Sequence, residues 1–231
     1  MVTTFEQLEQ IRSTLNNYPN APLCVDYNRS FSPFINKIKH VIKNRHTPLM
    51  INYRMNAGFI PKEHWIQTKV GAGRIIGEAC HIFDLFCYLT DAKPVSVSVE
   101  AVHASREDIF PTDNFTAHVR FSDGSVCSLI YTALGHVKPG KELMEIFFDS
   151  KTIVMDDYLS LDGYGLAPWF QETVSYPEKG HEQLIGRFFD GLRTPEFNPP
   201  ISYERLDMVA ELTLIIDQIA CEGGGSKELA W

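Results

Sequence analysis

Apolar positions recur along this chain with two different periods, and the period changes near residue 95. Before that point two short apolar runs, Leu23–Tyr27 and Pro48–Tyr53, indicate strands, and most apolar residues repeat every three to four positions, which is typical of amphipathic helices. After it they alternate with polar residues, as in VSVSVEA (Val95–Ala101) and NFTAHVRF (Asn114–Phe121). Such alternation indicates strands with one buried face. Helical periodicity returns near the end, so the pattern predicts helices at both ends of the chain and a run of strands between them.

The expected helices cover Thr4–Leu15, Ser32–Lys43, Gly71–Thr90, His181–Leu192 and Tyr203–Cys221. The expected strands cover Leu23–Tyr27, Pro48–Tyr53, Val95–Ala101, Asn114–Phe121, Val126–Thr132, Leu143–Phe148 and Thr152–Met155. From Val95 onward, short turns such as Ser122-Asp123-Gly124 join the strands without intervening helices, which favours antiparallel pairing. The fold class expected is therefore α+β, with a large, mostly antiparallel open sheet and helices on one face. The face of the sheet away from the helices carries the polar positions of these strands. It is either exposed to solvent or docked on a second subunit.

The composition of the chain argues against several classes of protein function. A formal net charge of -8 argues against a nucleic-acid partner, because phosphate binding needs a positive surface. The five cysteines are widely spaced and no Cys/His cluster has metal-ligand spacing, so no metal site and no disulfide framework is expected. The N-terminal residues do not resemble a signal peptide, and no apolar run is long enough to span a membrane. These features predict a cytoplasmic protein.

One predicted helix carries most of the candidate chemistry. Within Gly71–Thr90 the polar residues Arg74, Glu78, His81 and Asp84 are spaced by four, three and three positions. In a regular helix they lie in one narrow stripe, which suggests a groove rather than a solvated face. A carboxylate one turn away on each side would orient the imidazole and raise its pKa toward neutrality, which suits a general acid/base. Equally, His81 and Asp84 could simply satisfy each other and the nearby backbone.

The same helix begins with glycines in a spacing that imitates a nucleotide-binding turn. Gly71, Gly73 and Gly77 precede or open the helix, and Glu100 follows a later strand. The residues before Gly71, HWIQTKV, are too polar for a buried parallel strand, and a strand meander follows instead of a second βαβ unit. We therefore expect no dinucleotide fingerprint at this glycine string.

Four segments together resemble a known family. GRIIGEACHIFDL (residues 73–85), VDYNRSFSP (25–33), YRMNAGFIPKEHW (53–65) and KGHEQLIGRFFDGL (179–192) occur in the order found in the C-terminal domain of the Gfo/Idh/MocA (glucose-fructose oxidoreductase/inositol dehydrogenase) family. The sequence of the first segment is similar to that of family members associated with polysaccharide and sugar-nucleotide metabolism. The resemblance extends over nearly the whole chain. It implies an open-sheet domain like the C-terminal domains of dihydrodipicolinate reductase and glyceraldehyde-phosphate dehydrogenase.

The resemblance also implies roles for individual residues. His81 matches the histidine that family members place beside the reacting carbinol carbon, as acid/base or substrate ligand, and Asp84 would support it. Many members carry an acid where this chain has Gly77, so Glu78 is the available carboxylate. Sugar contacts are implied for Arg54, Asn56, His64, Trp65 and Arg74, although Trp65 suits a core anchor equally well. Arg29 lies where the family joins its two domains, where a structural role suffices.

The chain departs from the family pattern at its beginning. Residues 1–30 resemble the last helix and strand of a nucleotide-binding domain, and no glycine fingerprint or Glu-Lys-Pro motif precedes them. Residues 31–222 are expected to form the substrate-binding and oligomerisation domain, and 223–231 a mobile tail. The expected function is the substrate-binding half of an NAD(P)-dependent sugar or sugar-nucleotide oxidoreductase, inactive alone and binding no cofactor by itself. Assembly into a homodimer or tetramer through the open sheet is also expected. A separate nucleotide-binding domain is a further expected partner. The alternatives are a non-catalytic sugar-binding or assembly module and an excised piece of a complete dehydrogenase.

Overall fold

A computed structural model describes residues 2–106 and 108–231, so residues 1 and 107 of the expected segments 1–30 and 31–222 lie outside it. Its centre is a nine-stranded sheet with the order β8-β7-β6-β5-β1-β4-β3-β2-β9. The strands are β1 (Met50–Asn56), β2 (Pro94–Ala101), β3 (Asn114–Phe121), β4 (Val126–Thr132), β5 (Glu142–Phe148), β6 (Lys151–Asp156), β7 (Ser160–Tyr164), β8 (Glu172–Thr173) and β9 (Gly224–Glu228). All strand pairs described are antiparallel except β1 with β4.

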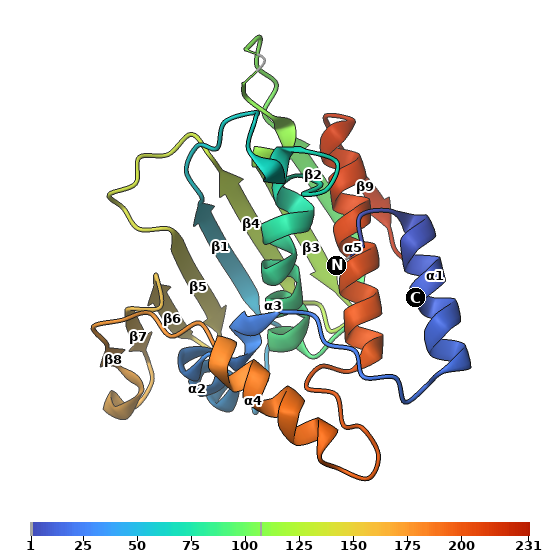
Figure 1. Ribbon diagram of the computed structural model, residues 1–231. Helices are drawn as coiled ribbons and strands as arrows, with labels where there is room; N and C mark the ends of the chain where they lie inside the picture. Colours follow the sequence, from blue (N-terminus) through green and yellow to red (C-terminus); the bar gives the residue numbers. More distant parts are fainter. Residues whose placement is uncertain (1, 107) are drawn as a thin grey trace.

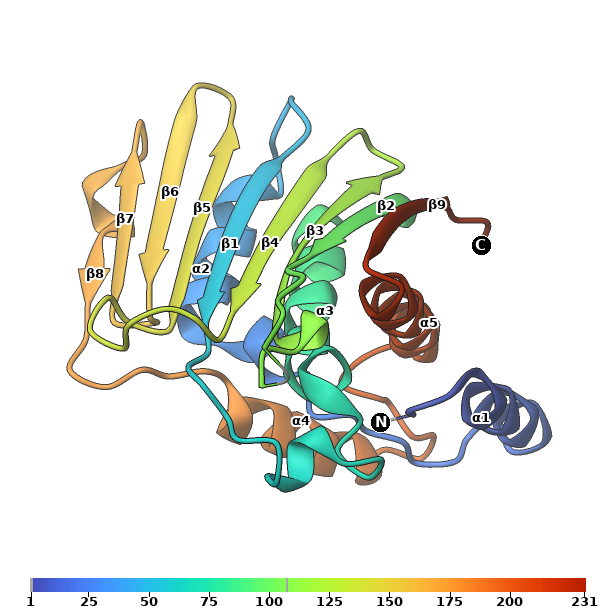
Figure 2. The same cartoon turned by 90° about the horizontal axis from the view of Figure 1, so that it is seen from above.

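The helices lie on one face of this sheet (Figures 1 and 2). They are α1 (Phe5–Asn17), α2 (Pro33–Ile42), α3 (Cys80–Thr90), α4 (His181–Leu192) and α5 (Tyr203–Cys221). Helix α3 is buried on nearly every side because it packs against both α5 and the sheet. Helix α1 packs on the outer side of α5 instead of on the sheet (Figure 2). The expected α+β class, the mostly antiparallel sheet and the helices on one face are therefore confirmed.

Strand alternation separates the two faces of the sheet. In β1 the side chains of Ile51, Tyr53 and Met55 are buried under the helices, whereas Asn52 and Arg54 lie on the open face. The same alternation recurs in β4 and β5. One apolar layer between sheet and helices forms the main core of the protein.

Two terminal segments differ from the sequence-based expectation. Residues 23–27, expected to be a strand, have no regular secondary structure and form no ladder with any described strand, since the nine strands pair without them. The tail, expected to be mobile, forms β9, which pairs with β2. Glycines made the tail look unstructured, but Gly224 and Gly225 adopt positive φ, and a Cβ on Gly224 would lie 3.0 Å from the carbonyl oxygen of Val99 in β2.

The predicted helix Gly71–Thr90 is also not regular throughout. Its first part, η3 (Ile75–Ala79), is a π-helical turn in which the Cys80 amide donates to the carbonyl of Ile75, and α3 begins only at Cys80. The extra residue in this turn rotates Arg74 and Glu78 relative to the residues that follow. The expected single polar stripe is therefore broken.

Hydropathy of the described helices gives no candidate for a membrane-spanning segment.

Candidate functional site

His81 lies in the first turn of α3 and is partly exposed. Its ring packs edge-on against Tyr27, with 5.9 Å between the ring centroids. Its Nδ1 atom is buried and has no hydrogen-bond partner among the described residues. Neutral histidine offers one donor and one acceptor, so the other ring nitrogen, Nε2, which is not among the buried unpartnered atoms, is the one that can bind a ligand hydroxyl.

A buried carboxylate, Glu142, influences the pKa of His81. Arg29 binds it through two hydrogen bonds, at 2.8 Å and 3.1 Å, and the ammonium of Lys179 lies 2.6 Å from it. The Tyr53 hydroxyl donates to the same carboxylate. Burial would raise the pKa of Glu142, but the charges of Arg29 and Lys179 outweigh it and lower the pKa to about 2. The group is therefore ionised at neutral pH.

A second carboxylate, Glu78, acts on the imidazole from the π-helical turn. It accepts hydrogen bonds from Arg74 at 2.9 Å, from Lys141 at 2.5 Å and from the Tyr131 hydroxyl. Burial again opposes ionisation, yet Lys141 and the hydrogen bonds lower the pKa of Glu78 to about 2. Each carboxylate is thus matched by an arginine, a lysine and a tyrosine.

Because Glu78 and Glu142 are each paired with cations, the pKa of His81 differs from the expectation. The sequence-based expectation was a raised pKa, since carboxylates lie one turn away. The structure shows the opposite, because burial and the Arg29 charge lower the pKa to about 3, against the opposing effect of Glu78 and Glu142. The carboxylate charges are already compensated by their own cations, so the imidazole is neutral at pH 7.

Asp84, expected to support His81, points elsewhere. It is 0% exposed and lies 3.0 Å from Nε of Arg205 on α5. Burial raises its pKa to about 6, with Arg205 acting in the opposite direction. Asp84 joins α3 to α5, and the expectation that it pairs with the histidine is wrong.

The residues expected to contact sugar divide into two groups in space. Arg54 lies on the open sheet face and donates to the carbonyl of Gly140 at 3.2 Å. Asn56, at the end of β1, is buried, donates to the carbonyl of His136 at 2.7 Å and leaves its Oδ1 without a partner among the described residues. Both side chains therefore hold the loop between β4 and β5.

The remaining expected contacts lie on or under the loop before η3. Arg74 is 2% exposed, and its guanidinium donates to the carbonyls of Ala57 and Gly58 as well as to Glu78. Its donors are used inside the protein, so it anchors the loop. Trp65, by contrast, is 61% exposed and packs beside His64, so it is no core anchor.

The glycine string does not form a nucleotide cradle in the described residues. Gly71 follows η2 (Trp65–Gln67) and a turn, not a strand. A Cβ built on Gly71 would lie 2.3 Å from Cα of Ile66, so this glycine is packed against protein backbone. A pyrophosphate needs open backbone amides at such a turn. The turn at Gly71 therefore leaves no open space beside its backbone for a pyrophosphate.

Sequence reasoning missed the four charged partners Glu142, Lys141, Lys179 and, as a site residue, Arg29. A signal for Glu142 was present. It shares its strand face with Met144, Ile146 and Phe148, so simple alternation places a carboxylate in the core. No group of three or more possible metal ligands occurs within residues 2–106 and 108–231.

Comparison with known proteins agrees with this geometry. The model of the GFO/IDH/MocA C-terminal domain matches residues 43–154. A search of curated proteins found no match. The fold is similar to myo-inositol dehydrogenase from Lactobacillus casei, solved with NAD(H) and myo-inositol, with a TM-score of 0.72 and 16% identity over 100% of this chain and 68% of that one.

Two further solved structures are similar. WlbA dehydrogenase from Bordetella pertussis, solved with NADH and UDP-GlcNAcA, has a TM-score of 0.73 and 18% identity over 100% of this chain and 70% of that chain. UDP-N-acetylglucosamine 3-dehydrogenase GnnA from Acidithiobacillus ferrooxidans has a TM-score of 0.71 and 18% identity over 94% of this chain and 67% of that chain. At these identities the likeness shows the fold. The family match and the fold together support the assignment of residues 43–154 to the GFO/IDH/MocA C-terminal domain.

Proposed function

We propose that this chain is the substrate-binding and oligomerisation part of an NAD(P)-dependent oxidoreductase acting on a sugar or sugar nucleotide. The observation that carries the proposal is the partly exposed imidazole of His81, whose pKa is influenced by the ionised carboxylates of Glu78 and Glu142, on a GFO/IDH/MocA-type domain. The substrates printed for similar folds, myo-inositol and UDP-sugars, support a polyhydroxylated ligand.

Within this function His81 would bind a substrate hydroxyl. Its pKa of about 3 favours a neutral hydrogen-bonding role over general acid/base work, because an effective base needs a pKa near the working pH. Glu142 and Glu78 would keep the surrounding cations in place, and their charges would stabilise any proton that the imidazole takes up. Trp65 would offer a flat apolar face to a sugar ring.

The nicotinamide cofactor would supply hydride transfer, and we place its binding site outside residues 2–231. Support comes from the packed Gly71 turn. Residues 2–30 would be the last part of the nucleotide-binding domain without contributing to its cofactor site, since segment 23–27 has no ladder partner in this sheet. The chain alone would then show no turnover. If the nucleotide-binding part does not exist, the same packed turn favours a non-catalytic sugar-binding module.

Oligomerisation would use the open face of the sheet. Met50, Ile130 and Phe147 lie on this face with exposed side chains, and Met50 is paired with Phe147 across β1 and β5. Light scattering of the chain should give a dimer or larger assembly, and Phe147→Glu should shift it toward the monomer. A monomeric wild-type protein would exclude this part of the proposal.

The free thiols of the five cysteines suit a reducing, cytoplasmic compartment.

Calorimetric titration tests the substrate role. UDP-N-acetylglucosamine and myo-inositol are titrated into the 231-residue chain, the His81→Ala variant and the exposed control His46→Ala. Binding of either compound by wild type and His46→Ala, weakened about tenfold or more by His81→Ala, is expected for a lost hydrogen bond to a buried ligand hydroxyl. Equal affinity in all three proteins would exclude the role of His81. NADH is titrated in parallel, and tight binding would show that the Gly71 turn accepts a nucleotide after all.

A further inference from the structure

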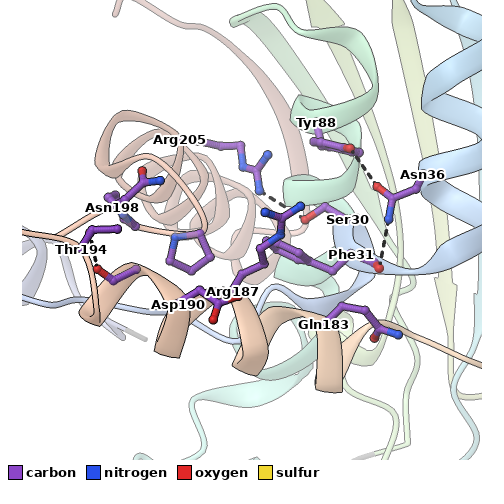
Figure 3. Close-up of a pocket in the computed structure, with 13 residues that line it drawn as sticks. Ser30, Phe31, Asn36, Tyr88, Gln183, Arg187, Asp190, Thr194, Asn198 and Arg205 are labelled. Carbon is purple, nitrogen blue, oxygen red and sulfur yellow. Dashed lines mark hydrogen bonds between the residues drawn. The ribbon is translucent and has the colours of Figure 1, made fainter.

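Residues of η1 (Asn28–Phe31) line a hollow whose lining does not include His81. Consecutive residues of this segment face different surroundings, because Arg29 binds Glu142 while the Ser30 hydroxyl receives a hydrogen bond from Arg205 at 3.2 Å. Ser30 and Arg205 line a hollow of about 500 Å³ between α2, α3, α4 and the start of α5 (Figure 3). This volume lies within the range of small-molecule sites.

The charges around the hollow do not cancel. The charge of Arg205 is opposed by Asp84 at 3.0 Å, and that of Asp190 by Arg193 at 3.0 Å. Arg187, which extends from α4 toward Ser30 in Figure 3, forms no ion pair with any residue in 2–106 or 108–231. The guanidinium of Arg187, with all its donors available, therefore faces the hollow beside the guanidinium of Arg205. Such a fork matches a carboxylate or a phosphate.

The neutral lining fits hydroxyl groups. The side-chain amides of Gln183 and Asn198 both line the hollow, and neither forms a hydrogen bond with the described part of the chain. Amides of this kind bind hydroxyls as donor and acceptor together. Phe31 and Pro199 add apolar surface, which suits the C–H face of a sugar ring.

We propose that this hollow is a second binding site, for a small hydroxylated anion of the sugar-acid or sugar-phosphate class. Arg187 holds the carboxylate or phosphate next to Arg205, and the amides of Gln183 and Asn198 bind hydroxyls. The residues that line this site do not include His81.

Calorimetry with D-glucuronate, glucose 6-phosphate and glucose tests the proposal on the whole chain. We expect at least one anion to bind about tenfold more tightly than glucose, and the tighter anion identifies the charged group. Arg187→Ala should weaken that anion about ten- to a hundredfold, because it removes a charge-assisted hydrogen-bond pair. Arg187→Lys should recover only part of the affinity, since lysine lacks the planar fork.

Arg120→Ala is the matched control. It removes the same charge from an exposed position on the opposite face of the sheet and should leave the affinity unchanged. Circular dichroism confirms that each variant is folded. Binding of glucose as tight as that of both anions, or equal affinity in wild type and Arg187→Ala, would overturn the assignment of this site.

Discussion

The carboxylate of Glu142 accepts two hydrogen bonds from the guanidinium of Arg29, at 2.8 Å and 3.1 Å, in the interior of the protein. Arg29 belongs to the segment that enters the domain, and Glu142 begins a central strand. The pair therefore fixes the entry segment, and with it Tyr27, against the sheet next to His81.

Removing one member of this pair should be costly. Arg29→Ala leaves a buried carboxylate with only Lys179 as a cationic partner, and we expect the free energy of unfolding to fall by about 3–5 kcal/mol. Arg193→Ala, which breaks an exposed pair with Asp190, should change it by less than about 1 kcal/mol. Urea denaturation measures both values. Similar losses in the two variants would mean that the buried pair has no special structural weight.

His81 should remain neutral over the physiological range. Burial and Arg29 lower its pKa to about 3, so its imidazole signals should not titrate between about pH 5 and pH 8. Nitrogen-detected NMR of the histidine rings, assigned with a His81→Asn variant, follows the protonation directly. A titration centred near the ordinary value of 6.5 would show that the ring is solvated or that a carboxylate binds it.

Asp84 predicts a specific pH dependence of stability. Because burial raises its pKa from 3.8 to about 6, the native state holds a proton that the unfolded chain loses above about pH 4. Its contribution to stability is therefore full below about pH 4 and is lost as the pH rises through about 6. The stability of wild type relative to Asp84→Asn should fall over this range.

Denaturation at several pH values between about 4 and 7 measures that difference. Asp26→Asn, at an exposed position, is the control and should show no comparable trend. A difference between wild type and Asp84→Asn that rises with pH would mean that Arg205 dominates the carboxyl group and keeps it ionised.

Two glycines should respond to alanine in opposite ways. Gly186 lies in α4 with no atom within 4 Å of a built Cβ, so Gly186→Ala should raise stability by about 0.5–1 kcal/mol through helix propensity. At Gly71 a Cβ would meet the backbone of Ile66 at 2.3 Å, and Gly71→Ala should lower stability by about 1–3 kcal/mol. Thermal denaturation compares them. A tolerated Gly71→Ala would mean that the turn before η3 is free to move.

The fold could be predicted from the sequence where local pattern and tertiary environment agree. The alternation of β3 and β4 was visible in the sequence, and so was the helical period of α1. The segment β9 was not predicted, because its pairing depends on β2, which lies more than a hundred residues earlier in the chain. The strand expected at residues 23–27 has the right pattern but lacks a partner strand in this sheet.

The candidate site was only partly predictable for a related reason. The helical segment with His81 was identified, but its geometry assumed a regular helix, and the π-helical turn at Ile75–Ala79 has no sequence signal of its own. The effect of Arg29 on the imidazole depends on contacts over long separations, such as its pairing with Glu142. Whether the pKa of His81 is raised or lowered depends on all the charged residues around it. The spacing of residues along one helix does not show those residues.

The central claim is that the imidazole of His81 faces a bound sugar, and a crystal structure of this chain with UDP-N-acetylglucosamine or myo-inositol tests it most directly. We expect a sugar hydroxyl oxygen within about 2.6–3.2 Å of an imidazole nitrogen of His81. A sugar bound with all of its hydroxyls beyond hydrogen-bonding reach of His81, with that ring covered by protein, would contradict the claim.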